Sequence, residues 1–341
     1  MKKSQNKILI FVFTLFIFNS PFVIHNCLSQ WVHCGLGTNY VYCLYNMGNF
    51  IFAGTDSTGV YYTSNNGLNW VHTSLNNRTV GAITSAGYYI LAGTEHQGAF
   101  RSTDEGASWS QTSLNNQSVR AFVVDGINIY AGTLVNGVYS STNSGTSWVQ
   151  HNINLTDVLS LSVNGNNIFA GTNVGVWKST NNGINWAQTS LTNGLIHTTV
   201  VSNNILFASF STLLDSTEIL RSTNNGLNWQ QTSFHYNQTL SLLINGNNFF
   251  VGGAISGFFL STDYGISWQQ HNEGLPQSTS FPSLCIFNNW LYGGTYGYGI
   301  WKRNLAELIG ITPISILEQY DRLLRHPKRK LTMSGSVIVG R

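Results

Sequence analysis

Three carboxylates and two tyrosines are the side chains of this sequence best suited to chemistry, because they lie where the chain departs from an otherwise regular spacing. They are Asp215, Glu218, Glu273, Tyr296 and Tyr298. Carboxylates beside tyrosines can bind a sugar, a peptide or a cation, and in principle a carboxylate pair can act as general acid and base. Random variation in loop length would also explain the irregularities. We take the five residues as a candidate ligand-binding set and turn to the elements that must position them.

The regular spacing comes from a motif of the form Ser-x-Asp/Asn-x-Gly-x-x-Trp, which occurs five times, with a close sixth copy that begins at Thr63. The tryptophans are 38 to 43 residues apart, and an apolar-Ala-Gly-Thr marker or a variant of it recurs between them. Such periodicity predicts a repeat architecture. The polar, glycine and tryptophan positions of the six copies are Asn65, Gly67 and Trp70; Asp104, Gly106 and Trp109; Asn143, Gly145 and Trp148; Asn181, Gly183 and Trp186; Asn224, Gly226 and Trp229; and Asp263, Gly265 and Trp268.

Each repeat is expected to form four short strands separated by Gly and Asn clusters, for example 158–163, 168–171, 175–179 and 185–189. In the motif, Asp or Asn can accept backbone N–H bonds, Gly can adopt a positive φ, and Trp can cover the neighbouring sheet. We therefore expect these residues to be structural, and no residue is predicted to be catalytic.

A seventh repeat lacks its own copy of the motif and of the strand that follows it, and the first residues after position 30 can supply that strand. Trp31-Val32-His33 matches Trp70-Val71-His72, and 23 residues separate each of these tryptophans from the next glycine marker. The first strand should therefore complete a blade whose other strands lie near 283–303. The sequence predicts an all-β, seven-bladed β-propeller of four-stranded blades over residues 30–304, closed by its N-terminal strand, so that the sheet edges are protected.

The two ends differ from the repeats. Residues 1–29 combine Lys2 and Lys3 with an apolar run and small residues before Gln30, which is typical of a secretory signal peptide. A membrane anchor and a lipoprotein are the alternatives, but the apolar run is shorter than the roughly 20 residues that a span requires. We expect a secreted or cell-surface protein without a membrane span after cleavage. Residues 305–341 are expected to be a linker-like, basic and disordered tail.

The charge and cysteine content of the sequence indicate which classes of partner and cofactor to expect. Only 9% of residues are charged, and much of the net charge of +3 comes from the two ends, so no basic face for nucleic acid is expected. Cys34, Cys43 and Cys285 are an odd set whose disulfide pairing the sequence leaves open. Their spacing suggests no metal. We expect a monomer without metal or cofactor.

The motif, as in Ser102-Thr-Asp-Glu-Gly-Ala-Ser-Trp109, is similar to that of the Asp-box (BNR-like) propellers. That group includes sialidases, xyloglucan-degrading glycosidases, sortilin-type receptors and the photosystem II stability and assembly factor. The resemblance implies the fold and leaves the function open, because this fold hosts enzymes and receptors. The Phe-Arg-Ile-Pro segment and the arginine triad of sialidases have no match here, and the chain has length for one ring. The short, Asn-rich repeats most resemble those of secreted Bacteroidota proteins. Those proteins often carry a type IX secretion sorting domain, although its signature is not found in this sequence.

Two loops break the repeat. Ser209 and Trp229 are 20 residues apart where other blades need 15 or 16, and Trp268 and Gly294 are 26 apart rather than 23. By the strand order that the resemblance implies, both loops open on the face opposite the boxes. We therefore expect a secreted, non-catalytic binding or scaffold protein that recognises a protein or glycan through these loops. The alternatives are a glycoside hydrolase of sialidase or xyloglucanase-like type and an assembly factor resembling the photosystem II factor.

Overall fold

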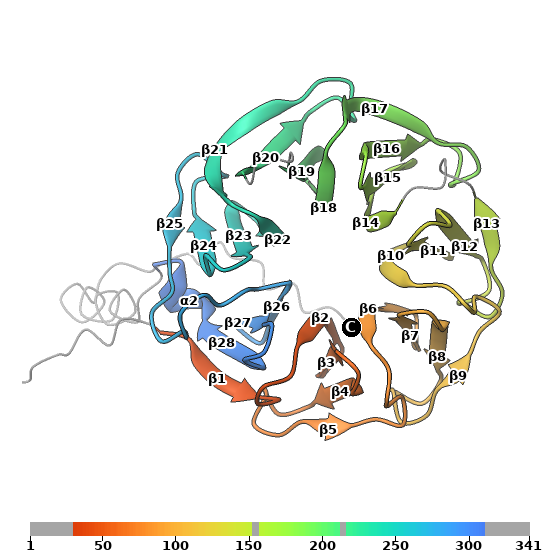
Figure 1. The fold of residues 1–341 in the computed structure, drawn as a ribbon, viewed down its shortest axis with the longest axis horizontal. Helices are drawn as coiled ribbons and strands as arrows, with labels where there is room; N and C mark the ends of the chain where they lie inside the picture. Colours follow the sequence, from red (N-terminus) through yellow and green to blue (C-terminus); the bar gives the residue numbers. More distant parts are fainter. Residues whose placement is uncertain (1–29, 152–156, 212–215, 311–341) are drawn as a thin grey trace, which may run out of the picture.

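The computed structural model describes residues 30–151, 157–211 and 216–310. It contains seven four-stranded antiparallel sheets arranged as blades around a central channel (Figure 1). The predicted all-β, seven-bladed propeller is therefore confirmed. The predicted signal peptide, Asp215 and residues 311–341 of the tail lie outside the described residues.

Blades 1 to 4 run from the innermost strand outward in chain order. Their strands are β2 (Val41–Met47), β3 (Phe50–Thr55), β4 (Gly59–Thr63) and β5 (Val71–His72); β6 (Val80–Ala86), β7 (Tyr89–Thr94), β8 (Gly98–Ser102) and β9 (Ser110–Gln111); β10 (Val119–Asp125), β11 (Asn128–Thr133), β12 (Val138–Ser141) and β13 (Val149–His151); and β14 (Val158–Asn164), β15 (Asn167–Thr172), β16 (Gly175–Ser179) and β17 (Ala187–Thr192).

Blades 5 and 6 repeat this order, and blade 7 takes its outermost strand from the start of the chain. The strands are β18 (Leu195–Ser202), β19 (Ile205–Ser211), β20 (Ser216–Ser222) and β21 (Gln230–Asn237); β22 (Thr239–Asn245), β23 (Asn248–Gly253), β24 (Phe258–Ser261) and β25 (Gln269–Gln270); and β26 (Ser283–Phe287), β27 (Trp290–Gly294), β28 (Ile300–Asn304) and β1 (Val32–Gly35).

The ring closes through β1, as predicted. It pairs antiparallel with β28, with Val32 opposite Lys302. Trp31, which precedes β1, is 1% exposed, and its ring lies 5.1 Å from both Phe258 and Phe281. Its Nε1 donates a hydrogen bond of 2.9 Å to the carbonyl of His271. The N-terminal strand is thus held by an anchor in the core as well as by backbone pairing.

A short helix, α2 (Leu305–Leu308), follows β28 directly. Leu305 and Leu308 are buried in the same hydrophobic cluster as Trp31. The side chain of Asn304 caps the helix by accepting the backbone N–H of Glu307. Residues 305–308, which the sequence assigned to the tail, therefore pack onto the ring.

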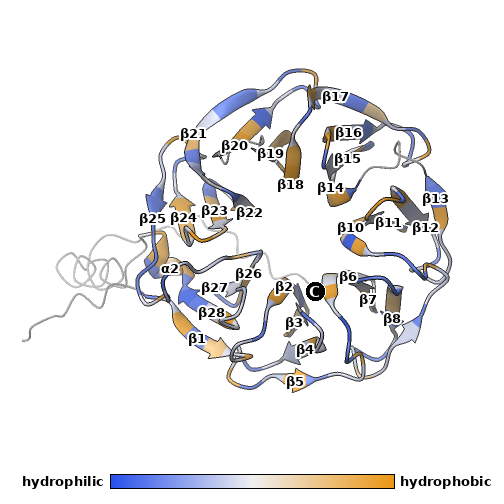
Figure 2. Ribbon diagram, viewed as in Figure 1, coloured by the Kyte–Doolittle hydropathy of each residue, from blue (hydrophilic) through white to orange (hydrophobic). Residues whose placement is uncertain are grey.

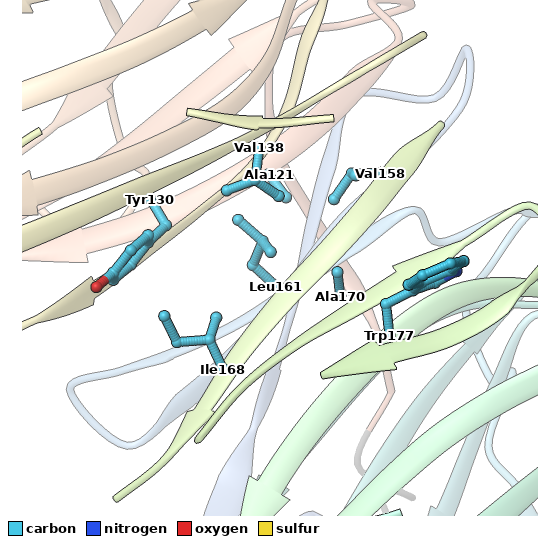
Figure 3. Packing of buried hydrophobic residues seen from close by; sticks show 8 residues of the cluster. All are labelled: Ala121, Tyr130, Val138, Val158, Leu161, Ile168, Ala170 and Trp177. Carbon is cyan, nitrogen blue, oxygen red and sulfur yellow. The ribbon is translucent and has the colours of Figure 1, made fainter. Parts of the chain in front are cut away.

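Hydrophobic packing lies mainly between neighbouring blades. Figure 3 shows this arrangement between blades 3 and 4, whose contacting side chains are Ala121, Tyr130, Val138, Val158, Leu161, Ile168, Ala170 and Trp177. The outermost strands β17 and β25 are largely hydrophilic, whereas β1 and β5 carry apolar residues (Figure 2). Because each blade buries both faces of its inner strands against its neighbours, the blades stabilise one another.

The Ser-x-Asp-x-Gly-x-x-Trp motif forms the turn between the third and fourth strands. In blade 2, Asp104 Oδ1 accepts the Ser108 backbone N–H at 2.8 Å and the Ser102 hydroxyl at 2.8 Å. Gly106 has a φ of 90°, and Trp109 Nε1 donates to the carbonyl of Gly106. Trp109 also packs against the hydrophobic cluster between blades 1 and 2. We call the end of the ring that carries these turns the box face.

The opposite end, which we call the loop face, carries the turns between second and third strands, because successive strands are antiparallel. The residue two positions after the box tryptophan fastens these turns to the outermost strand. In five blades its side chain contacts a turn carbonyl 14 residues earlier, the residues being His72, Gln111, Gln150, Gln188 and Gln270. In these five blades the turns of the loop face are therefore held to the outermost strand.

Candidate ligand-binding site at the channel mouth

β-Bulges aim side chains into the channel. In six of the seven innermost strands, the register with the second strand shifts close to the start of the strand. A bulge leaves one residue unpaired and redirects its side chain. Residues at these shifts line the channel together with Pro282 of blade 7, and they are Tyr42, Gly81, Arg120, Leu159, His197, Thr198 and Leu240.

The cavity that these residues line has a volume of about 280 Å³ and opens on the loop face, where the innermost strands begin. One backbone position thus holds very different side chains around the channel. The mouth is consequently asymmetric, with its aromatic and charged groups concentrated on blades 1, 2, 3 and 7.

Three tyrosines form the aromatic part of the mouth. The ring of Tyr296 lies 5.7 Å from that of Tyr40 and 5.5 Å from that of Tyr42. Tyr40 is 48% exposed. Burial, and after it the negative charge of Asp56, raises the pKa of Tyr42, and burial also raises the pKa of Tyr296. The Tyr42 and Tyr296 phenols therefore stay protonated at neutral pH and can donate hydrogen bonds to a ligand.

A charged pair stands beside the tyrosines. Arg120 donates a hydrogen bond of 2.7 Å to the Glu95 carboxylate, and both side chains remain partly exposed. Gly81 lies next to this arginine, and a Cβ at that position would be in ordinary contact with the Arg120 side chain at 3.6 Å. Solvent screens such a pair, so its contribution to stability is about 1 kcal/mol or less. Its placement at the mouth favours a role in orienting a polar ligand.

Two exposed apolar side chains on the loop face lie on strained backbone. Val135 has a φ of 72° and Ile255 a φ of 50°, and they are 57% and 63% exposed. Branched residues rarely adopt this left-handed conformation, which clusters at functional sites. Each backbone N–H is held by the next blade, Val135 by the Asp157 carboxylate and Ile255 by the Ser280 hydroxyl. Both residues present apolar surface to solvent.

The structure describes four of the five residues that the sequence proposed. Tyr296 and Tyr298 lie in the turn between β27 and β28 on the loop face, and Tyr298 is exposed. Glu218 lies in β20, opposite Phe210 and His235. No described contact joins Glu218 to the tyrosines, and Asp215 lies outside the described residues.

Glu273 is engaged in closing the ring. Its carboxylate accepts a hydrogen bond of 2.7 Å from Arg303, which is almost fully buried, and its carbonyl accepts the Trp31 backbone N–H at 2.8 Å. The ligand-binding role proposed for Glu273 remains a prediction, whereas its contacts with β1 and β28 are direct.

The sequence analysis did not single out Tyr40, Tyr42 or Arg120. The available signal was the residue between the apolar start of each innermost strand and the small residue two positions later, as in Val119-Arg120-Ala121. This repeat position holds Tyr42, Gly81 and Arg120 in successive blades. Such variation indicates a side chain that does not pack in the core, unlike the residues on either side of it.

Cysteine and metal chemistry add little to this site. Cys34, Cys43 and Cys285 are free thiols, so no disulfide joins them, and burial raises the pKa of each to about 12. Within residues 30–151, 157–211 and 216–310, no group of three or more His, Cys, Asp or Glu could hold a metal ion. Over the same ranges, no helix has the length and hydrophobicity needed to cross a membrane.

Comparisons with solved structures identify relatives of the fold. An ancestral GH74 enzyme superposes with a TM-score of 0.66 and 19% identity over 80% of this chain and 46% of that chain. The extracellular domain of the one-component system BT4673 from B. thetaiotaomicron superposes with a TM-score of 0.66 and 15% identity over 81% of this chain and 40% of that chain. The structure of YCF48 bound to D1 peptide superposes with a TM-score of 0.63 and 15% identity over 83% of this chain and 98% of that chain. All are similar in fold.

This chain is a seven-bladed β-propeller resembling those of GH74 enzymes, the BT4673 domain and YCF48. It spans less than half of the ancestral GH74 enzyme and of the BT4673 chain but nearly the whole of YCF48. No protein-family model matches the sequence, and no curated protein matches it. At these identities the likeness concerns the fold, so function must be argued from the site.

Proposed function

We propose that this propeller is a secreted, non-catalytic binding protein that holds an extended polypeptide segment across the mouth of its channel. The observation that carries the proposal is the contact of Tyr296 with Tyr40 and Tyr42, beside the Arg120–Glu95 pair. Tyrosines give a large contact area at low entropy cost and also donate hydrogen bonds, which is why they are common at protein-recognition surfaces.

Three features favour a polypeptide over a glycan. Val135 and Ile255 offer apolar contacts at separate points of the loop face, which suits a ligand with spaced side chains. The paired Arg120 and Glu95 can each bond a backbone amide of a ligand without requiring that it be charged. YCF48, which shares the fold, is known in a complex with a D1 peptide, and this supports peptide binding by such a ring.

A glycoside hydrolase is the alternative that the GH74 likeness brings forward. Two observations weigh against it. Glu273, one of the carboxylates that could serve as acid or base, is engaged by Arg303. Among the described residues that line the channel, Arg120 is the one arginine, and it is paired with Glu95. Neither arrangement resembles a carboxylate pair that flanks a glycosidic bond.

The test is an array of extended peptides probed with the full ring, followed by affinity measurements on the strongest binder. Tyr296→Ala should weaken binding about tenfold, as loss of a tyrosine anchor does at other interfaces. The control is Tyr88→Ala, because Tyr88 is 90% exposed in the turn between β6 and β7 on the box face. Equal affinity of the two variants, or turnover of a fluorogenic glycoside that Glu218→Gln abolishes, would contradict the proposal.

A further inference from the structure

A second cavity lies far from the channel, on the outer side of the ring between blades 4 and 5. It has a volume of about 340 Å³, a size that suits a sugar unit or two. We call it the rim groove. Its principal lining residues are Lys178, Trp186, Ala187, Gln188, Asn225 and Leu227.

Ala187 explains why a groove exists at this place. It lies in β17 opposite Lys178 of β16. It is the smallest residue at its position of the repeat, so it leaves the space beside Lys178 unfilled. The corresponding residues of the other six outermost strands are Val32, Val71, Ser110, Val149, Gln230 and Gln269.

Lys178 differs from the other basic residues at its repeat position, because within the described part of the chain it forms no hydrogen bond, ion pair or ring contact. The other three are engaged. Arg101 lies 3.7 Å above the Tyr89 ring, Arg221 donates to Gln230 at 3.2 Å, and Lys302 donates to the Asn66 carbonyl at 2.7 Å. The Lys178 ammonium is thus available to a ligand in the rim groove.

The other walls of the rim groove complement a sugar. Trp186 is half-buried, and its Nε1 is bonded to the Gly183 carbonyl, which fixes the orientation of the indole. An indole offers a flat apolar surface to the C–H groups of a sugar ring. The side-chain Oδ1 of Asn225 accepts a hydrogen bond of 3.1 Å from Asn164 Nδ2, so the Nδ2 of Asn225 is left to donate to a hydroxyl.

We propose that the rim groove is a binding site for an acidic saccharide, a sugar that carries a carboxylate. Trp186 stacks on the sugar ring, Asn225 bonds its hydroxyls, and Lys178 pairs with the carboxylate. This site shares no residue with the channel mouth and does not rest on the polypeptide-binding function proposed above.

The experiment is calorimetric titration of the whole chain with a disaccharide of galacturonic acid and with its neutral galactose counterpart. The parent should bind the acidic disaccharide saturably and the neutral one about tenfold more weakly, as expected when one charge-assisted hydrogen bond is lost. Absence of saturable binding, or equal binding of both sugars, would overturn the proposal.

Two variants taken from the repeat itself test the residues. Lys178→Ser introduces the residue found at Ser140, and Ala187→Val the one found at Val71 and Val149, so the fold should tolerate both. Each should weaken binding of the acidic disaccharide about tenfold, by removing the charge or filling the groove.

The matched controls are Arg221→Ser and Val149→Ala, the same kinds of change in neighbouring blades, and both should leave the affinity unchanged. Tyr296→Ala should also leave it unchanged, so a failure here is separable from a failure at the channel mouth. An equal loss in variants and controls would refute the assignment.

Discussion

Individual residues of this ring fall into two kinds of repeat position. At the box positions, each residue satisfies the backbone of its own turn, as Asp104 and Gly106 do. At the bulge position, the backbone is fixed but the side chain is free to vary, as from Gly81 to Arg120. Recognition is expected at the second kind, because a substitution there alters the channel without disturbing a turn.

The box aspartates predict a pH dependence of stability. Hydrogen bonds from the Ser267 hydroxyl and backbone N–H hold the pKa of Asp263 at about 2, and Ser108 lowers that of Asp104 in the same way. A carboxyl whose pKa is lowered on folding stabilises the fold above its unfolded pKa, near 3.8, and this contribution is lost as the pH falls towards 2. Both side chains are exposed, so the effect is modest.

The Asp104→Asn, Asp263→Asn double variant should therefore melt like the parent near neutral pH and lose less stability on acidification. Asn occupies the same position in four other boxes, so the turn should be kept. Melting temperatures at about pH 5 and about pH 2 measure the difference. An equal fall in the parent and the variant would show that these carboxylates are not responsible.

Residue roles were predictable from the sequence only where the residue type determines the role. Asp, Gly and Trp of the boxes could be assigned from turn chemistry. Glu273 could not, because its buried partner Arg303 is 30 positions away and lies beside it only once the strands of blade 7 have folded. Within one blade Arg120 could not either, since nothing in the alternation marks Val119 to Ala121 as a bulge; the available signal is the variation of this position among the repeats.

Among the elements, β1 is only four residues long, but it closes the ring. It covers the free edge of β28 and brings Trp31 into the core between blades 6 and 7. An uncovered edge strand is a template for association with another chain. Deleting residues 30–36 should therefore lower the melting temperature strongly and promote aggregation.

Val32→Ser is the control for this deletion, because Val32 lies in the same strand but is half-exposed, and it should melt close to the parent. Melting curves and light scattering report both effects. A deleted ring that melts like the parent and stays monomeric would mean that β1 contributes little to closure.

Element boundaries followed the sequence closely where the apolar alternation was clear. The expected strands 158–163, 168–171 and 175–179 correspond to β14, β15 and β16. Residues 305–308 were assigned to a tail because their composition resembles a linker, yet Leu305 and Leu308 are buried. That burial depends on a pocket made by Trp31 and blade 6, which are distant in sequence.

At the scale of the whole molecule, the repeat determines the ring, and departures from the repeat distinguish its surfaces. The loop face carries the tyrosines and the Arg120–Glu95 pair, while the rim groove lies on the outer side between two boxes. The ring could be predicted because its period is regular over seven blades. The recognition surfaces could not, because they combine single residues from several blades.

Photo-crosslinking tests the location of the ligand most directly. A photoreactive phenylalanine analogue would replace Tyr40, which is half-exposed at the channel mouth, or Tyr88, which is exposed on the box face. With the strongest peptide from the array bound, we expect a covalent adduct from position 40 and none from position 88. An adduct from position 88 alone, or none from position 40 while the peptide remains bound, would contradict binding at the channel mouth.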